Sequence, residues 1–299
     1  MRAVIAGVGY AGLATARAFL AAGWEVFGLT HSAESAERLS TEFPCAACDI
    51  TQRASVAGLA DHGVAGADVL IHCASSSRGG AEAYRAVYLD GSRHLLEERA
   101  PRRFLFTSST SVYAQTDGGL VEETSPAEPP RETGRLLRET ENYVLAHGGL
   151  VARLAGIYGP GRSVLLRKFL SDEAVIEGDG QRVLNQIHRD DIATALLALA
   201  ERGAPGIYNV CDDTPMTQVE LYTGLAQKLA RPLPPSGPID PNRKRGWTSK
   251  RVSNARLRAL DWSPRWPSFF TAVEGEPDLL RLAREQAEAQ IAGTSEGPL

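Results

Sequence analysis

The sequence predicts an α/β protein built on a doubly wound parallel sheet of the Rossmann type. Short apolar runs rich in β-branched residues alternate with longer runs of helical period, and a glycine-rich turn follows the first apolar run. Runs such as VLIHCA and FLFTS do not alternate polar with apolar residues, which is typical of strands covered on both faces. The order of elements therefore favours a parallel sheet with helices on both sides.

The first half of the chain repeats this rhythm of strand and helix. Strands are expected at residues 2–7, 24–30, 45–50, 67–74 and 102–109, with helices at 11–23, 32–43 and 83–100. After a turn-rich loop, the charged segment 131–141 predicts another helix. Residues 149–161 then predict a strand that ends in a Tyr-Gly-Pro-Gly turn.

Beyond residue 163 the pattern becomes less regular. A helix at 190–203, a strand at 206–212 and a helix at 217–230 precede a proline-rich run at 232–241. We interpret this part as a smaller substrate-binding lobe, interleaved with the first domain, that closes over the carboxyl ends of the strands. The predicted boundaries are 1–163 for the NAD(P)-binding Rossmann domain, 164–290 for the lobe and 291–299 for a flexible tail.

Composition limits the class of protein. The 299 residues carry a formal net charge of -4, so no overall basic field favours nucleic acid or an anionic membrane. Strand-like sequence begins at Arg2 without a leader, and no apolar run is long enough to span a bilayer, which predicts a soluble cytoplasmic protein. Cys45 and Cys48 form a single CxxC without a second ligand pair; we expect them to be small buried apolar residues of a strand and predict no metal.

The glycine-rich turn is the first candidate site. Residues 7–12, GVGYAG, match GxGxxG between a strand and a helix within one βαβ unit. Gly7 permits the tight turn, Gly9 lets the backbone approach a pyrophosphate, and Gly12 allows the helix to pack closely on the sheet. The helix start at Tyr10 and Ala11 adds amide donors and the positive end of the helix dipole. The motif predicts a dinucleotide site.

The end of the second strand bears on which dinucleotide binds. A site that prefers NAD usually carries Asp or Glu about 20 residues after the glycines, where it accepts from the ribose hydroxyl. Here the strand ends in Thr30, His31 and Ser32, and no carboxylate appears before Glu34. Because this end tolerates a 2′-phosphate, we predict NADP as the cofactor, with NAD possible, and these three residues as phosphate neighbours.

Further motifs follow the glycine turn in a characteristic order. ADVLIHCAS, FTSSTSVYAQ, RLAGIYGPG, NQIHRDD and SKRVSNARLRAL resemble the extended short-chain dehydrogenase/reductase superfamily, its nucleotide-sugar epimerase/dehydratase group, and most closely its atypical members. The resemblance runs from residue 1 to about residue 275. It implies an NAD(P)-dependent oxidoreductase or epimerase-type enzyme that acts on a small carbonyl, hydroxyl or sugar-like substrate. A homodimer is compatible with the resemblance, because dimerisation is common in that family.

The resemblance also implies roles for individual residues. Ser109 falls where the family places its catalytic serine, and Tyr113, close to it in sequence, is a candidate acid. Cofactor contacts are implied for Asp49, Ile50, Cys73, Ala74, Ser75, Thr107, Ser108 and Tyr158. Substrate contacts are assigned to Gly156, Asn185, His188, Lys250 and Arg251, the last two toward an anionic ligand.

The predicted helix at 131–141 departs from the family's pattern. The family carries a tyrosine and, four residues later, a lysine on this helix; aligned through Gly134 and Glu141, these positions hold Thr133 and Leu137. Threonine is too weak an acid near neutral pH, and leucine offers no donor. The remaining candidates for proton transfer are Tyr113, Tyr158, His188 and Tyr84.

Two functions stay open on these observations. One is an enzyme with an atypical active site in which Ser109 polarises the substrate oxygen; the other is a catalytically degenerate NADP(H)-binding sensor or regulatory protein. Gly156 and Leu184 stand where nucleotide-sugar enzymes carry Asn and Arg, which argues against a nucleotide-sugar substrate. The basic segment 243–258 is interpreted as a solvated face or an anion-binding rim of the substrate lobe rather than a nucleic-acid surface.

Overall fold

The centre of the molecule is a seven-stranded parallel sheet. The structure, a computed structural model, describes residues 1–59, 64–76, 79–240 and 247–295, with backbone only at 292–295. The strand order is β12-β7-β5-β4-β1-β2-β3, so the direction of winding reverses between β1 and β4. The predicted doubly wound sheet is confirmed. Its strands are β1 (Arg2–Ala6), β2 (Glu25–Thr30), β3 (Cys45–Ala47), β4 (Val69–His72), β5 (Phe104–Ser109), β7 (Leu150–Leu154) and β12 (Gly206–Val210).

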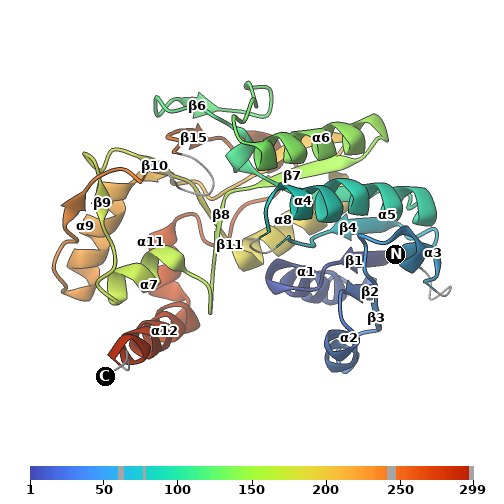
Figure 1. Cartoon of the computed structure of the whole chain (residues 1–299), viewed down its shortest axis with the longest axis horizontal. Helices are drawn as coiled ribbons and strands as arrows, with labels where there is room; N and C mark the ends of the chain where they lie inside the picture. Colours follow the sequence, from blue (N-terminus) through green and yellow to red (C-terminus); the bar gives the residue numbers. More distant parts are fainter. Residues whose placement is uncertain (60–63, 77–78, 241–246, 296–299) are drawn as a thin grey trace.

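Helices cover both faces of this sheet, which explains its unbroken apolar strands. On one face α1 (Tyr10–Ala21) packs against α8 (Arg189–Arg202), and on the other α6 (Glu132–Ala146) lies beside α4 (Ala81–Tyr84) and α5 (Gly91–Arg99) (Figure 1). A π-helical turn, η1 (Arg85–Asp90), joins α4 to α5. The shorter α2 (Ala33–Leu39) and α3 (Arg53–Ala57) follow β2 and β3. All four residues of β4 are buried, as two covered faces require.

The helix at the predicted 131–141 segment is longer than its charged sequence suggested. α6 buries one stripe, including Leu136, Leu137, Thr140 and Val144, at the spacing that places residues on one face of a helix. The remaining face carries most of its Arg and Glu residues. The charged residues therefore lie mainly on the solvent-exposed side of α6. The first turn of α6 lies at the carboxyl ends of β5 and β7.

A second hydrophobic cluster forms the core of the smaller lobe. Phe169, Tyr222, Leu225 and Phe269 are among its buried members. The lobe is interleaved with the first domain, because α8 and β12 return from it to the large sheet. Its elements are α7 (Val164–Leu170), β9 (Ile176–Glu177), β10 (Val183–Leu184), β13 (Met216–Thr217), α9 (Gln218–Leu229), β14 (Ser236–Gly237), α11 (Phe269–Gly275) and α12 (Pro277–Ser295).

Short strand pairs connect the two parts. β8 (Gly156–Tyr158) pairs with β11 (Gln186–His188), and β6 (Leu120–Val121) pairs with β15 (Arg251–Val252). A 3₁₀ turn, η2 (Thr110–Val112), follows β5, and α10 (Ala255–Arg258) follows β15. Helix α12 continues to Ser295, into the segment predicted as a tail; residues 296–299 lie outside the described residues. Among the described residues, no helix has both the length and the apolar character needed to cross a membrane.

Candidate active site and cofactor cleft

The glycine turn has the geometry expected of a dinucleotide loop. Gly7 has φ +94°, and a Cβ there would lie 2.3 Å from the backbone nitrogen of Ala74. A Cβ on Gly12 would lie 2.1 Å from the carbonyl oxygen of Gly7, so this helix can approach the loop only without a side chain. A Cβ on Gly9 would meet no described heavy atom within 4 Å. The loop is therefore closed behind Gly7 and Gly12 and open in front of Gly9.

The amino end of α1 carries positive charge as well as free space. Gly9 is its N-cap, and no side chain caps it. Tyr10 donates its hydroxyl proton to the carbonyl oxygen of Pro160 (3.1 Å), and burial raises the pKa of Tyr10 to about 12. The guanidinium groups of Arg162 and Arg189 lie 5.4 and 5.2 Å from the centre of its ring. Arg189, in NQIHRDD, was expected in the cleft from the sequence, whereas Arg162 was missed although it follows the Gly-Pro-Gly turn.

The end of β2 is polar, and one carboxylate approaches it from another strand. Thr30 is buried and donates to the carbonyl oxygen of Ser32 (3.0 Å), while the Ser32 hydroxyl accepts from the amide of Ser35 and caps α2. The exposed His31 ring lies with its Nδ1 3.9 Å from Oδ1 of Asp49. Asp49 in turn accepts two hydrogen bonds from Thr51. Asp49 and Ile50 therefore stand beside the residues predicted to contact the 2′-phosphate.

The ends of β4 and β5 bring the next predicted cofactor residues against the glycine loop. Ala74 packs on Gly7, and Thr107 donates to the carbonyl oxygen of His72 (2.9 Å). Burial raises the pKa of the Cys73 thiol to about 12, so this side chain is a neutral wall. Ser75 follows on the exposed side of the same loop. These positions lie together where the sheet's winding reverses, the usual ligand edge of such a sheet.

A buried ion pair lies directly behind the predicted catalytic serine. Ser108 donates to Oε1 of Glu141 (2.6 Å), and Arg153 binds both oxygens of that carboxylate, at 3.0 and 2.7 Å. Arg138 also pairs with Glu141. Because each buried charge has hydrogen-bonded partners, the network holds β5, β7 and α6 in register with one another.

Tyr113 belongs to the same buried network. Its side chain is fully buried, its hydroxyl lies 2.8 Å from Oδ1 of Asn209 and 3.0 Å from the carbonyl oxygen of Glu122, and its ring lies under Arg153. Burial raises its pKa above the usual value. These contacts are those of a framework residue, and they give no support to the prediction that Tyr113 acts as an acid.

Two further residues from the prediction lie in or beside the lobe's core. Tyr158 is buried, with its ring edge-to-face against His188 and Phe269. His188 caps α8 by accepting from the amide of Asp190 (3.2 Å), and burial lowers the pKa of His188 to about 4. These contacts do not place the ring of Tyr158 or of His188 in the wall of the cleft. His188 acts as the N-cap of α8.

Three side chains that could bind a metal ion lie close together at the start of α8, beside the guanidinium of Arg189. His188, Asp190 and Glu276 bring their ligand atoms within 4.8 Å of one another, but Asp190 already accepts a 2.8 Å hydrogen bond from the Arg189 guanidinium. A fixed positive charge at this position disfavours a cation.

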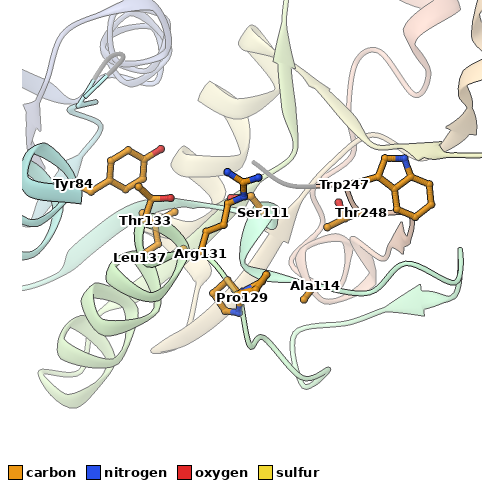
Figure 2. A pocket seen from close by; sticks show the side chains of 11 residues that line it. Tyr84, Ser111, Ala114, Pro129, Arg131, Thr133, Leu137, Trp247 and Thr248 are labelled. Atoms are coloured by element: carbon orange, nitrogen blue, oxygen red, sulfur yellow. The ribbon is translucent and has the colours of Figure 1, made fainter. Parts of the chain in front are cut away.

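A cavity of about 220 Å³ opens at the start of α6 (Figure 2). Thr133 and Leu137, one turn apart on α6, both contribute to its wall, so the two positions singled out from the sequence share this cavity. Ser109 caps η2 by accepting from the amide of Ser111 (3.2 Å), and Ser111 is the serine that lines the cavity. The described lining consists of Tyr84, Ser111, Ala114, Pro129, Pro130, Arg131, Thr133, Gly134, Leu137, Trp247 and Thr248.

Lys250 lies behind the wall of this cavity. Its ammonium donates to the carbonyl oxygen of Tyr113 (2.8 Å) and to the hydroxyl of Thr248 (3.0 Å), which lines the cavity. Burial, with a smaller effect of Arg182, lowers the pKa of Lys250 to about 8. Only 4% of Lys250 is exposed, so it does not belong to a solvated face, and its contact with an anionic ligand stays a prediction.

The other predicted substrate residues build the frame around Lys250. The Asn185 amide donates to the carbonyl oxygen of Lys250 and accepts from the amide of Val252, both at 2.8 Å. Gly156 allows the Asn185 backbone to approach β8 closely. Arg251 is exposed and donates to the carbonyl oxygen of Gly118 (2.6 Å). Residues 243–246 of the basic segment lie outside the described residues.

Comparison with known proteins places the chain in a family. A model of the NAD dependent epimerase/dehydratase family matches residues 3–211, more than two thirds of the chain. The chain therefore belongs to the NAD dependent epimerase/dehydratase family, and the resemblance predicted from the sequence is confirmed at that level. Protein YeeZ of Escherichia coli strain K12 is 30% identical over 246 residues, 76% of this chain and 84% of YeeZ.

Solved structures give the same fold. A provisionally assigned NAD-dependent epimerase/dehydratase from Methylobacillus flagellatus is 27% identical, with a TM-score of 0.74 over 95% of this chain and 98% of its own. A dTDP-glucose 4,6-dehydratase from Streptomyces venezuelae, with NAD bound, is 22% identical, with a TM-score of 0.76 over 95% and 97% of the two chains. At that identity the second likeness shows the fold alone.

Proposed function

We propose that this protein is an NADP(H)-dependent oxidoreductase or epimerase-type enzyme that acts on a small carbonyl, hydroxyl or sugar-like substrate with an atypical active site. One observation carries the proposal. The open glycine loop and the cavity at the start of α6 lie at the carboxyl ends of strands in one parallel sheet, β1 for the loop and β5 for the cavity. In such a sheet this edge is where a cofactor and a substrate meet.

The residues present fit a dinucleotide. Gly9 leaves room for a pyrophosphate in front of an uncapped helix end, and the guanidinium groups of Arg162 and Arg189 lie nearby. Thr30, His31 and Ser32 would receive the 2′-phosphate of NADP. The remaining predicted contacts, Asp49, Ile50, Cys73, Ala74, Ser75 and Thr107, would flank the adenine and the nicotinamide half. When bound, the nicotinamide cofactor supplies or accepts a hydride.

The chain's own residues must orient the substrate and move a proton. Ser109 ends β5, and Ser111 lies in the following turn η2 and lines the cavity; their hydroxyl groups are the candidates to polarise a substrate oxygen. Thr133 and Leu137 occupy the cavity wall without an acid or a positive charge, which is what makes the site atypical. We assign Tyr113 a structural role on the basis of its contacts.

The size of the cavity favours a small substrate. Its volume of about 220 Å³ lies below the ~300–1,000 Å³ usual for sites that hold a drug-sized ligand. The UDP-glucose 4-epimerase of Thermotoga maritima, which shares this fold at 20% identity, was solved with the much larger UDP-glucose. We therefore propose a substrate without a nucleotide group.

Hydride transfer tests the enzyme proposal. Steady-state assays across carbonyl, alcohol and sugar substrates should reveal turnover with NADP(H) that falls at least ~100-fold in Ser109→Ala, as expected for loss of an oxygen-polarising group. Ser236→Ala, at an exposed position of the smaller lobe, is the matched control and should retain full turnover. Tight cofactor binding without turnover on the whole panel would instead identify the sensor alternative.

Cofactor choice is tested separately. Fluorescence titration should give tighter binding of NADPH than of NADH. His31→Asp places a carboxylate at the exposed end of β2 and should weaken NADPH at least ~10-fold while sparing NADH, because like charges repel. His31→Asn, which adds no charge, should keep the preference. A wild-type preference for NADH would contradict the proposed role of Thr30, His31 and Ser32.

A further inference from the structure

The cavity at the start of α6 has an unusual balance of charge. Among its described lining residues only Arg131 and Tyr84 are ionisable, and none is a carboxylate. The Arg131 side chain makes no hydrogen bond or ion pair with the part of the chain that the structure describes. Its backbone is the N-cap of α6, and no side chain caps that helix. A guanidinium group with five donors therefore faces a cavity at the positive end of a helix.

Tyr84 adds a phenol from a different element. It is the last residue of α4, which packs beside α6, and its ring lies edge-on to Tyr88 with the centres 5.0 Å apart. In Figure 2 its hydroxyl end points into the cavity beside Thr133, and the guanidinium of Arg131 faces the same space. The cavity thus contains a phenol and a positive charge, the two kinds of group that Thr133 and Leu137 cannot supply.

The remaining walls limit the size and polarity of a ligand. Ala114, Pro129, Pro130 and Leu137 are apolar, and Trp247 adds an indole at one side (Figure 2). The volume of about 220 Å³ is small for a ligand site, below the ~300–1,000 Å³ usual for drug-sized ligands. A ligand of only a few carbon atoms fits this space, with polar ends directed at the few polar groups in the wall.

We infer that this cavity binds a small hydroxy- or oxo-carboxylate, with its carboxylate at Arg131 and its hydroxyl or carbonyl oxygen at Tyr84. A single planar guanidinium matches a carboxylate through two parallel hydrogen bonds. Among the described residues, Arg131 is the cation in the cavity lining, and Lys250 directs two of its three donors to Tyr113 and Thr248 behind the wall, so the described lining matches the single charge of a carboxylate better than a dianionic phosphate ester.

The inference rests on the proposed function and completes its proton transfer. In the reducing direction, a reduced nicotinamide held at the glycine loop would supply the hydride and be oxidised, so that the carbonyl carbon gains a C–H bond and the C=O π electrons move to the substrate oxygen. The Tyr84 O–H bond breaks as its proton passes to the substrate oxygen, and solvent returns a proton to the phenolate. Arg131 stabilises the phenolate electrostatically and holds the carboxylate.

Binding measured without turnover tests the carboxylate assignment. The probes are 2-, 3- and 4-hydroxybutanoate and the corresponding hydroxybutanamides, titrated by calorimetry in the presence of NADPH. Reduced cofactor and reduced ligand cannot exchange a hydride, so the readout is independent of activity. At least one acid should bind 10-fold or more tightly than its amide, as expected for a charge-assisted Arg–carboxylate pair. Equal binding of every acid and its amide overturns the inference.

Matched variants locate the charge. Arg131→Leu should reduce the preference for the acid to less than about 2-fold, and Arg131→Lys should restore part of it. Arg85→Leu removes the same charge from the residue next to Tyr84, where it forms only a surface ion pair with Glu139, and should keep the preference. If Arg131→Leu retains the full preference, the carboxylate does not bind at Arg131 and the inference is wrong.

A second contrast tests the phenol. Tyr84→Phe should weaken the best hydroxybutanoate about 3- to 10-fold, the usual effect of one lost hydrogen bond, and leave butanoate, which lacks the hydroxyl, unchanged. Equal effects on both ligands, or none on either, contradict the role of Tyr84. These binding results stand apart from turnover: if no substrate is oxidised or reduced, the proposed function fails, while the carboxylate site is still tested.

Discussion

The glycine loop and the cavity at the start of α6 lie at one edge of the same sheet but are built in opposite ways. The loop uses backbone: Gly7, Gly9 and Gly12 define its shape, and the end of α1 supplies amide donors. The cavity uses side chains, and they come from separate segments, with Tyr84 on α4, Arg131 at the start of α6 and Trp247 in a loop of the smaller lobe.

This difference explains why the glycine loop matches the family's motif while the cavity lacks the family's tyrosine and lysine. A pyrophosphate is recognised by amides that every residue except proline carries, so only the glycines have to be preserved. Proton transfer needs a particular acid at a particular place, yet several elements can bring one there. A helix can therefore lose its usual tyrosine while a neighbouring helix presents another phenol to the same space.

The largest expected effect breaks the loop. Gly7→Ala forces a Cβ to within 2.3 Å of the Ala74 nitrogen at a positive φ, and should abolish NADP(H) binding and lower the free energy of unfolding by about 2–5 kcal/mol. Fluorescence titration and urea denaturation measure the two effects.

Gly9→Ala is the matched variant. Its Cβ meets no described atom, so stability should stay within about 1 kcal/mol of wild type while cofactor binding weakens at least ~10-fold. Equal loss of stability in both variants would show that Gly9, too, serves only the fold.

The next effect concerns a buried base in the core of the cofactor half. His72 is fully buried, with Nδ1 3.2 Å from the Ser92 hydroxyl, and burial lowers the pKa of His72 to about 3. Below pH 6.5 the unfolded chain takes up a proton that the folded chain refuses, so stability is lost as the pH falls. Between pH 7 and 4 the wild type should lose about 3 kcal/mol more than His72→Gln. Parallel urea-denaturation profiles of the two proteins would exclude this assignment.

Burial of Lys250, behind the cavity wall, is expected to make stability depend on pH by a smaller amount. Lys250 has its pKa lowered to about 8, so the folded chain releases a proton that the unfolded chain keeps up to about pH 10.5. Stability therefore rises with pH in this window. Between pH 7.5 and 9.5 the wild type should gain about 2 kcal/mol relative to Lys250→Met, measured by urea denaturation. A variant whose pH profile matches the wild type would show that Lys250 does not titrate there.

The smallest effect sharpens the comparison at the active site. Thr133→Val removes one hydroxyl at nearly constant volume and should change kcat less than about 3-fold, while Tyr84→Phe should lower it at least ~100-fold, the range of a general acid. Steady-state kinetics at saturating substrate measures both. The reverse order of effects would exclude Tyr84 as the acid and assign the more important hydroxyl to Thr133, the position where the family carries its tyrosine.

The sequence alone was sufficient for the sheet, the glycine loop and the family. Each depends on local patterns: apolar runs report strands covered on both faces, and GVGYAG between a strand and a helix reports a backbone turn. The two close cysteines show where local pattern stops: Cys45 lies in β3 as predicted but is only half-buried, and Cys48 is buried as predicted but follows the strand. Such patterns can be recognised without knowing which other elements pack against the segment that carries them.

Only the tertiary structure decided what surrounds the chemistry. Tyr113 and Lys250 both looked available in the sequence, but packing between β5, β7 and the 247–252 segment buries them. Tyr84, in contrast, was one of several candidates until α4 and α6 placed it in the same cavity as Arg131 and Thr133. Periodicity reports which face of its own element a residue occupies. A cavity is formed by faces of different elements, and their meeting is fixed by the packing of the whole chain.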